Sequence, residues 1–310
     1  MRCERGATVV LYLVALACAI APAHAGAAGW RSAPIVPRIG TGLASELRGQ
    51  LADARAHGNR AGVFAKLGDS ITETQAYLQG VACGEERLAA HADLRPTIDF
   101  FHRVRFPDPY TAVWCGDADS FSRASAAAMS GQTAAWVTAS GAAGGAHCHA
   151  NESPLVCEYR LLRPAWSLVM FGTNDLEQIG DAQRYRQDMN RIVTQSRNRG
   201  VIPILSTIPP RLDSAGLNRR VNVYNDALYR LAASRGVLLV NFWRALTQQG
   251  MVHDGMYEDG IHPNVYVSYD CTPFCRPLDF GSEGLRYGYN QRNLITLETL
   301  DRIRREVIGN

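Results

Sequence analysis

The 310-residue chain lacks three features that would point to particular classes of partner. It has no long run of like charge, and its formal net charge is only +3, so nothing indicates a clustered basic face for nucleic acid. Beyond the N-terminus, no apolar stretch approaches the roughly 20 residues that a membrane-spanning helix needs. No segment repeats along the chain. What remains is an ordinary globular composition, 46% hydrophobic and 20% charged.

The first 25 residues have the pattern of a secretory signal peptide. Arg2 and Arg5 precede an uncharged apolar stretch over residues 7–21, and Ala23-His24-Ala25 is typical of a cleavage site. A membrane anchor is disfavoured because about 15 apolar residues are too few to span a bilayer. A lipoprotein signal ending at Cys18 fits only loosely and stays an alternative. We expect cleavage after Ala25 and a secreted or periplasmic protein.

Six of the eight cysteines lie beyond this leader, and an even number in an exported chain indicates disulfides. Pairing nearest neighbours predicts Cys83–Cys115, Cys148–Cys157 and Cys271–Cys275. The cluster of His147, Cys148, His149 and Cys157 is a candidate zinc site, but its spacing matches no standard pattern. Export also favours oxidised thiols, so we expect disulfides and no metal.

Short apolar segments alternate with segments of helical pattern along the mature chain. Strands are expected at residues 62–67, 166–171, 201–207 and 237–242, and helices at 43–57, 74–90, 131–139, 182–199, 217–234 and 294–308. This alternation predicts an α/β fold, a parallel sheet covered by helices on both faces. We expect one domain over residues 26–310. The stretches at about 94–122 and 265–290 are interpreted as insertions that border the pocket.

Polar residues follow the expected strands at the sheet edge where the active sites of such folds gather. Gly68-Asp69-Ser70 follows the first strand, Gly172-Thr173-Asn174-Asp175 follows the second, and Asp259-Gly260-Ile261-His262 comes after the last. A serine hydroxyl needs a base within hydrogen-bond reach, and a neutral histidine suits that task. Asp259, three residues before His262, can orient the imidazole. Asp254 is a rival carboxylate that the spacing disfavours.

Attack by a serine on a carbonyl creates a negative oxygen that needs hydrogen-bond donors. Gly131, at an expected loop-to-helix turn, can offer its backbone N–H, Asn174 its side-chain amide, and Ser70 its own N–H. Each block by itself is also explained by a turn or a helix cap. Their order, and the position of three blocks after apolar strands, favour an active site.

These four blocks, in this order, resemble those of the SGNH hydrolases, also called GDSL-like esterases. The resemblance implies a flavodoxin-like three-layer α/β/α sandwich with disulfide-bearing insertions. It implies Ser70 as nucleophile, His262 as base and Asp259 as the orienting carboxylate, with Ser70, Gly131 and Asn174 as the oxyanion hole. It implies no metal or organic cofactor, and it covers about residues 60–308.

The expected function is therefore that of a secreted, monomeric serine ester hydrolase. We expect a short-chain acyl ester as substrate, with an acetylated carbohydrate as one candidate. An O-acyltransferase and a non-catalytic carbohydrate-binding module on the same fold stay open as alternatives. Some aromatic residues are candidates for stacking on sugar rings, holding an acyl chain or filling the core of an insertion: Tyr77, Phe106, Tyr110, Trp114, Tyr266 and Tyr269.

Overall fold

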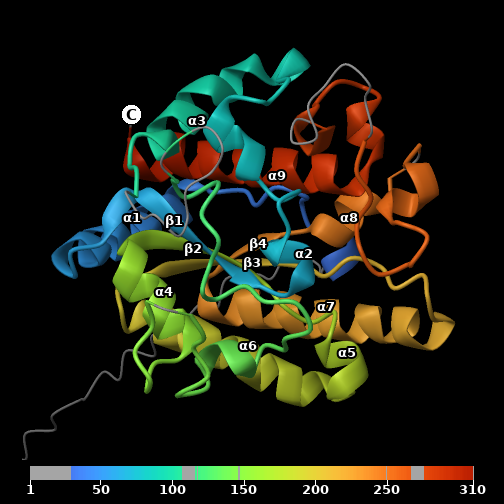
Figure 1. Cartoon of the computed structure of the whole chain (residues 1–310), viewed down its shortest axis with the longest axis horizontal. Helices are drawn as coiled ribbons and strands as arrows, with labels where there is room; N and C mark the ends of the chain where they lie inside the picture. Colours follow the sequence, from blue (N-terminus) through green and yellow to red (C-terminus); the bar gives the residue numbers. More distant parts are fainter. Residues whose placement is uncertain are drawn as a thin grey trace, which may run out of the picture.

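A computed structural model describes residues 29–106, 116, 118–145, 147–248, 250–266 and 276–309. Its centre is a four-stranded parallel sheet (Figure 1). The strands lie in the order β1 (Arg60–Gly68), β2 (Pro164–Met170), β3 (Ile202–Ser206) and β4 (Leu238–Val240). The predicted parallel sheet is confirmed. The expected signal peptide lies outside the described residues.

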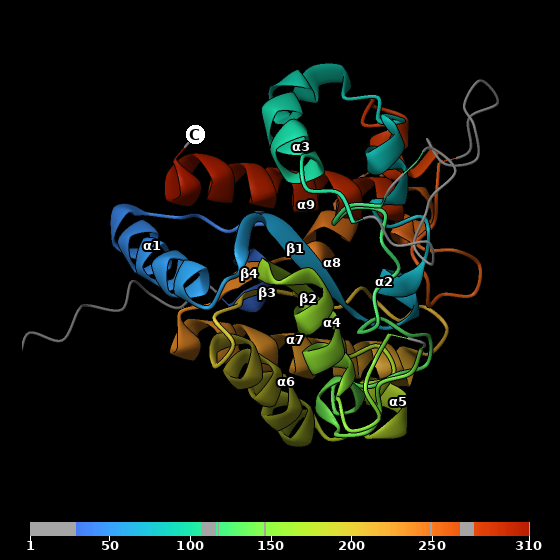
Figure 2. The ribbon, with the colours of Figure 1, turned by 60° about the vertical axis from the view of Figure 1, so that its left-hand side comes forward.

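Helices cover both faces of this sheet, which gives the predicted three layers (Figures 1 and 2). One layer contains α1 (Thr41–Ala56), α8 (Phe242–Leu246) and α9 (Gly288–Ile303), with α3 (Arg95–His102) packed on α9. The other contains α4 (Pro154–Leu162), α6 (Ala182–Arg197) and α7 (Ala215–Arg235). Two short helices, α2 (Ser70–Glu73) and α5 (Asp175–Gln178), follow β1 and β2. Short 3₁₀ segments and a closing π-helical segment are also present in the described chain: η1 (Trp30–Ser32), η2 (Gln79–Cys83), η3 (Ala89–Leu94), η4 (Trp136–Thr138), η5 (Val252–Gly255), η6 (Arg276–Leu278), η7 (Gly284–Arg286) and η8 (Arg304–Ile308).

The strands are buried on both faces, which explains their unbroken apolar sequences. Every residue of β2 is buried. In β1, the Phe64 ring packs edge-on against Phe101 and Phe121, with ring centroids 5.6 Å and 5.1 Å apart. The indole of Trp166 in β2 donates a hydrogen bond of 2.9 Å to the carbonyl of Ala61. The core therefore surrounds the sheet and leaves the strand ends for chemistry.

A further edge segment pairs with the outer side of β1. Gly68 donates to the carbonyl of Ala127 at 3.0 Å, and Met129 donates to the carbonyl of Gly68 at 3.1 Å. A parallel bridge joins Gly68 to Ala128. The second sheet segment along the chain thus lies at the edge, which is the strand order of flavodoxin-like sheets. This edge segment was not predicted, because a single bridge is too short to produce an alternation of apolar and polar residues in the sequence.

Two predicted helices are wrong. Residues 74–90 contain only short turns, because Leu78 takes a left-handed backbone with φ of 67° that a helix does not allow. Residues 131–139 contain only η4, and Gly131 has φ of +76°. Within the stretch at about 94–122 interpreted as an insertion, residues 95–102 form α3, whose Thr97 donates to Asp301 of α9 at 2.7 Å.

The predicted disulfide Cys148–Cys157 is confirmed, with the two Cα atoms 5.3 Å apart. These sulfurs are therefore not thiolates available to zinc. Cys83 is also disulfide-bonded. Its predicted partner Cys115, and both members of the predicted pair Cys271–Cys275, lie outside the described residues.

Candidate active site

Ser70 stands at the point where β1 ends and α2 begins. The chain turns sharply here because Gly68 has no side chain. A Cβ at Gly68 would lie 2.2 Å from the Thr72 hydroxyl and 2.6 Å from the carbonyl oxygen of Met170 in β2. This close packing places the Ser70 hydroxyl at the carboxyl end of the sheet, as predicted.

Asp69 caps the helix that Ser70 opens. Its carboxylate accepts a hydrogen bond of 3.1 Å from the backbone N–H of Ile71, while its second oxygen has no partner among the described residues. Burial raises the pKa of Asp69 to about 6, against the opposing effects of the Ile71 N–H, the Arg292 guanidinium and His262. Through its bond to Ile71, Asp69 fixes the turn that carries Ser70.

The structure brings Ser70, His262 and Asp259 into one hydrogen-bonded row. The Ser70 hydroxyl oxygen lies 2.9 Å from Nε2 of His262, and Nδ1 of His262 lies 2.7 Å from a carboxylate oxygen of Asp259. With the proton on Nδ1, the imidazole donates to Asp259 and accepts the Ser70 O–H. The rival carboxylate, Asp254, shows no such contact with His262. The three side chains therefore lie within hydrogen-bond reach of one another in the predicted order.

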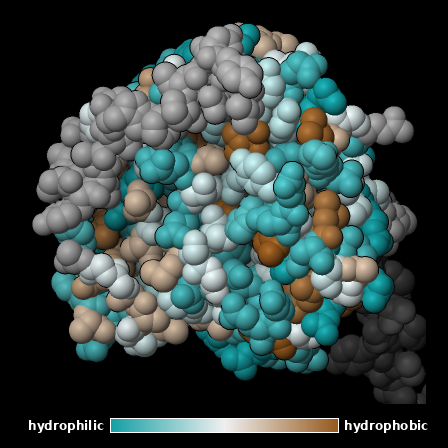
Figure 3. Space-filling view, turned by 45° about the vertical axis from the view of Figure 1, so that its right-hand side comes forward, coloured by the Kyte–Doolittle hydropathy of each residue, from teal (hydrophilic) through white to brown (hydrophobic). Residues whose placement is uncertain are grey.

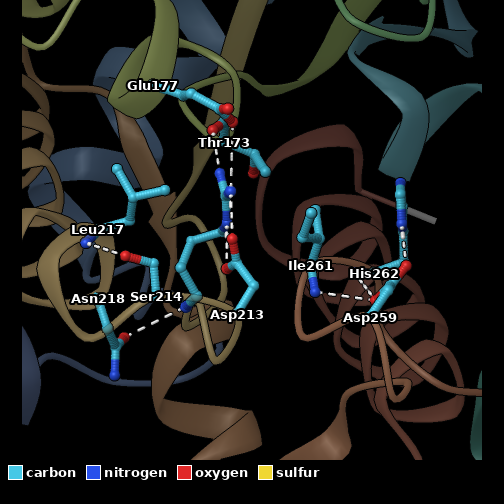
Figure 4. Close-up of polar contacts among 10 residues, drawn as sticks. Thr173, Glu177, Asp213, Ser214, Leu217, Asn218, Asp259, Ile261 and His262 are labelled. Carbon is cyan, nitrogen blue, oxygen red and sulfur yellow. Dashed lines mark hydrogen bonds and ion pairs between the residues drawn. The ribbon is translucent and has the colours of Figure 1, made fainter.

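The second oxygen of Asp259 holds the carboxylate in its own turn (Figure 4). It accepts hydrogen bonds from the backbone N–H groups of Ile261 at 2.9 Å and His262 at 3.0 Å. Burial favours a higher pKa for Asp259, but the hydrogen bonds from His262 and Ile261 outweigh it and lower the pKa below its ordinary value. Asp259 is thus held as an anion facing the imidazole.

Gly260 lets a neighbouring turn lie directly against residues 259–262, the candidate catalytic loop. Its backbone is left-handed, with φ of +68°, and a Cβ there would lie 2.3 Å from the backbone nitrogen of Asp213. Leu212 donates a hydrogen bond of 2.8 Å to the Gly260 carbonyl. The turn at 211–213 is therefore the wall that supports the catalytic loop from the side.

Arg211, which the sequence analysis missed, ties this turn to the segment after β2. It is buried and donates at 2.9 Å to the Thr173 carbonyl, twice at 2.8 Å to the Asp213 carboxylate, and at 3.3 Å to Glu177. Figure 4 labels all three partners. Arg211 therefore connects the segment that contains Asn174 to the turn at residues 211–213, which packs against the catalytic loop. The available signal was an arginine directly after the prolines that end the third strand.

The three predicted oxyanion donors lie on three linked segments. The backbone N–H groups of Ser70 and Gly131 donate no hydrogen bond to any described residue. The Asn174 amide donates one bond, of 3.0 Å, to the carbonyl of Gln132, which leaves its second N–H. Gly131 and Asn174 are thereby joined through Gln132.

The turn that contains Gly131 is held from two sides. The Glu73 carboxylate, on α2 with Ser70, accepts from the backbone N–H of Ser130 at 2.6 Å and from its hydroxyl at 2.5 Å. Gln178 of α5 donates at 2.9 Å to the Gly131 carbonyl. Sequence reasoning missed Glu73 and Gln178, because neither stands in a recognisable motif.

Asp175 holds the segment that follows Gly131. It is buried, and its carboxylate accepts the backbone N–H of Ala134 at 3.1 Å and 3.2 Å. Burial raises the pKa of Asp175 to about 7, the Ala134 N–H opposes the rise, and the negative charge of Asp69 adds to it. Asp175 therefore anchors the segment that runs from Gly131 toward η4.

Two of the six aromatic residues considered for substrate binding belong to the buried core. Tyr77 and Phe106 are buried, each under an arginine. Tyr266 is half-buried beside Tyr287, with ring centroids 5.3 Å apart. The other three candidates, Tyr110, Trp114 and Tyr269, lie outside the described residues.

Across the described part of the chain, none of the helices has the length and apolar character needed to cross a bilayer.

Comparison with known proteins gives a family. The model of the GDSL-like Lipase/Acylhydrolase family matches residues 66–266, a span that contains every predicted site residue. No curated protein matches the sequence.

Several solved structures are similar to this chain. One is a GDSL-like lipase from Bacteroides thetaiotaomicron, at 12% identity, covering 83% of this chain and 98% of that one, with a TM-score of 0.42. Another is a carbohydrate esterase of family 3 from Talaromyces cellulolyticus, at 16% identity, 76% and 97% coverage, and a TM-score of 0.46. A third is a catalytic mutant of an acetylxylan esterase from Geobacillus stearothermophilus, at 13% identity, 76% and 93% coverage, and a TM-score of 0.43.

Proposed function

We propose that this chain, which belongs to the GDSL-like lipase/acylhydrolase family and is a carboxylic ester hydrolase, works through a triad of Ser70, His262 and Asp259. The observation that supports the triad is the row of two short contacts, 2.9 Å from Ser70 to His262 and 2.7 Å from His262 to Asp259. A base within hydrogen-bond reach of a serine, itself oriented by a carboxylate, is what nucleophilic catalysis requires.

In the first half-reaction, the Ser70 oxygen attacks the ester carbonyl as its proton passes to Nε2 of His262. The carbonyl oxygen becomes negative and accepts hydrogen bonds from the N–H groups of Ser70 and Gly131 and from the Asn174 amide. The C–O bond to the alcohol then breaks, and His262 gives its proton to the departing alkoxide. An acyl group is left on Ser70.

In the second half-reaction, His262 takes a proton from water, whose oxygen attacks the acyl-enzyme. The intermediate collapses, the carboxylic acid leaves, and Ser70 recovers its proton from His262. Asp259 remains an anion throughout, and it stabilises the imidazolium that forms twice in each cycle.

The substrate we propose is a short-chain acyl ester of a carbohydrate. The site is open, since the side chains of His262 and Asp259 are 36% and 45% exposed. On the face shown in Figure 3, which brings forward the right-hand side of Figure 1, the coloured hydrophobic residues lie in separate patches among hydrophilic ones. A long acyl chain would need a continuous apolar surface to leave water. A small acyl group on a polar alcohol does not.

We also propose that the protein is exported, with residues 26–310 as its mature domain. The signal-peptide pattern supports this location. The disulfide Cys148–Cys157 agrees with it, because such bonds persist in oxidising compartments.

Hydrolysis of p-nitrophenyl acetate tests the triad. We expect Ser70→Ala and His262→Ala each to lower kcat/KM several thousandfold, on the order of 10³–10⁴. Asp259→Ala should also lose activity, whereas Asp254→Ala, a matched change of the rival carboxylate, should keep it. Loss of activity in Asp254→Ala alone would reverse the assignment, and full activity in Ser70→Ala would reject the mechanism.

A further inference from the structure

A pocket that the triad does not use lies next to the catalytic loop. It has a volume of about 370 Å³, within the roughly 300–1,000 Å³ that small-molecule sites occupy. Its walls come from η1, the turn after β3, α7, α8 and η5, and include Arg31, Leu212, Asn218, Asn222, Trp243 and Asp254.

The turn at Leu212 is shared between this pocket and the catalytic loop. Leu212 lines the pocket and donates its N–H to the carbonyl of Gly260 at 2.8 Å. Figure 4 shows Asn218 on one side of Asp213, and His262 with its partners on the other. The pocket therefore neighbours the site, separated from it by one turn of backbone.

Several polar groups in the pocket have no partner within the described ranges of the chain. The Asn222 amide and the Asp254 carboxylate make no hydrogen bond or ion pair there, and the Arg31 guanidinium makes only ring contacts. Asn218 accepts the backbone N–H of Arg211 at 3.2 Å, but its own N–H₂ donates to no described residue. The pocket thus offers both donors and acceptors.

The backbone that presents Asp254 is strained. His253 and Asp254 are consecutive non-glycine residues in the left-handed region, with φ of 49° and 54°. Such conformations cost about 1–3 kcal/mol each and cluster at ligand-binding positions. The backbone therefore holds Asp254 in one defined position at the wall of the pocket.

Trp243 supplies a flat apolar surface among these polar groups. It is half-buried, and Trp30 packs edge-on against it with ring centroids 4.7 Å apart. The Arg31 guanidinium lies 5.9 Å from the Trp243 centroid. An aromatic ring with a polar edge, surrounded by amides, a carboxylate and a guanidinium, suits a ligand with one apolar face and many hydroxyl groups. A pyranose or furanose ring has both features.

We infer that this pocket binds a sugar unit of the substrate, on the alcohol side of the ester that Ser70 cleaves. The inference rests on the proposed function. Because the Leu212 turn separates the pocket from the triad, the bound unit is a neighbour of the acylated sugar. The glycan crosses the turn over Leu212, whose side chain is exposed. A small aryl ester does not reach the pocket.

Two exposed or half-buried positions allow the test without disturbing the core. Asn222→Ala and Asp254→Ala each remove one hydrogen-bonding group, and Asn198→Ala, an exposed change at the end of α6, is the matched control. Trp243→Phe keeps an aromatic ring beside Trp30 and removes the indole N–H. Each variant is assayed on p-nitrophenyl acetate, on O-acetylated xylo-oligosaccharides and on O-acetylated cello-oligosaccharides.

We expect Asn222→Ala and Asp254→Ala to lower kcat/KM on an acetylated oligosaccharide about two- to tenfold each, the effect of one lost hydrogen bond, mainly through KM. Activity on p-nitrophenyl acetate should stay at the wild-type value in both. Equal rates of wild type and variants on every oligosaccharide, or an equal loss on the aryl ester, would overturn the inference. Ser70→Ala separates the two proposals, because its loss of aryl esterase activity depends on the triad alone.

Discussion

Replacing Arg211 by methionine should damage both stability and catalysis, because this buried side chain links two walls of the site. Methionine keeps an unbranched apolar chain of similar length and removes the guanidinium. The Thr173 carbonyl, the Asp213 carboxylate and Glu177 then lose their donor. The pKa of Asp213 lies below its ordinary value chiefly because of its hydrogen bond with Arg211, so that value should rise in the variant.

The size of the effect follows from the exposure of the three partners. Thr173 is buried, so a carbonyl left without a donor costs about 1–3 kcal/mol. The side chains of Asp213 and Glu177 are 24% and 65% exposed, so water replaces much of what they lose and the two pairs add about 1 kcal/mol together. We therefore expect Arg211→Met to lower the free energy of unfolding by about 2–4 kcal/mol.

The catalytic effect comes through Asn174, which follows Thr173 directly. Loss of one oxyanion donor lowers turnover by about 10²–10³, so a donor that is only loosened should cost about tenfold or more in kcat. KM for p-nitrophenyl acetate should change little, because the ground state does not carry the oxyanion charge.

Urea unfolding measures the change in the free energy of unfolding. Steady-state kinetics well below the melting temperature measure the change in kcat. Arg219→Met is the matched control, because Arg219 is an exposed arginine on α7. A wild-type kcat in a folded but destabilised Arg211→Met would show that Arg211 supports the fold alone. Wild-type stability and kcat together would refute the coupling.

Three further predictions use other parts of the structure. Gly260→Ala should lower both the free energy of unfolding and kcat. The left-handed backbone costs an alanine about 1–2 kcal/mol, and the added Cβ would lie 2.3 Å from the Asp213 nitrogen. An unchanged unfolding curve and unchanged kinetics would contradict this. The raised pKa values of Asp69, about 6, and Asp175, about 7, mean that the folded state binds these protons more tightly than the unfolded chain. The stability that this binding confers is present below pH 4 and is lost as the pH rises to about 7. Scanning calorimetry should therefore give a higher Tm at pH 5 than at pH 8. The opposite order would refute the raised pKa values of these two groups. Replacing Cys148 and Cys157 by serine should lower the free energy of unfolding by about 2–3 kcal/mol, the value for a loop closed over 9 residues, and equal urea midpoints would contradict it.

The sequence predicted best those features that depend on residues close together along the chain. Uninterrupted apolar segments predicted the buried parallel strands, because only a sheet covered on both faces needs them. The spacing of Asp259 and His262 predicted a contact that the structure places at 2.7 Å, because both residues lie in one short loop.

Features that depend on tertiary contacts were not predictable in this way. The edge segment at Ala128 is a single bridge, and the Arg211 network joins segments about 34 to 38 residues apart. Leu78 ends a helix-like sequence through a left-handed backbone that propensity does not favour. Its N–H is bonded to Asn293 of α9 at 3.1 Å, so a partner from the far end of the chain accompanies the turn.

The most direct test of the triad is covalent labelling of the serine. The purified protein is treated with a fluorophosphonate, and the modified peptide is identified by mass spectrometry in wild type and in His262→Ala. The account predicts a single adduct on Ser70, formed in wild type and slowed by orders of magnitude without the histidine. An adduct on another serine, or an equal labelling rate in His262→Ala, would contradict the assignment of Ser70 as the activated nucleophile.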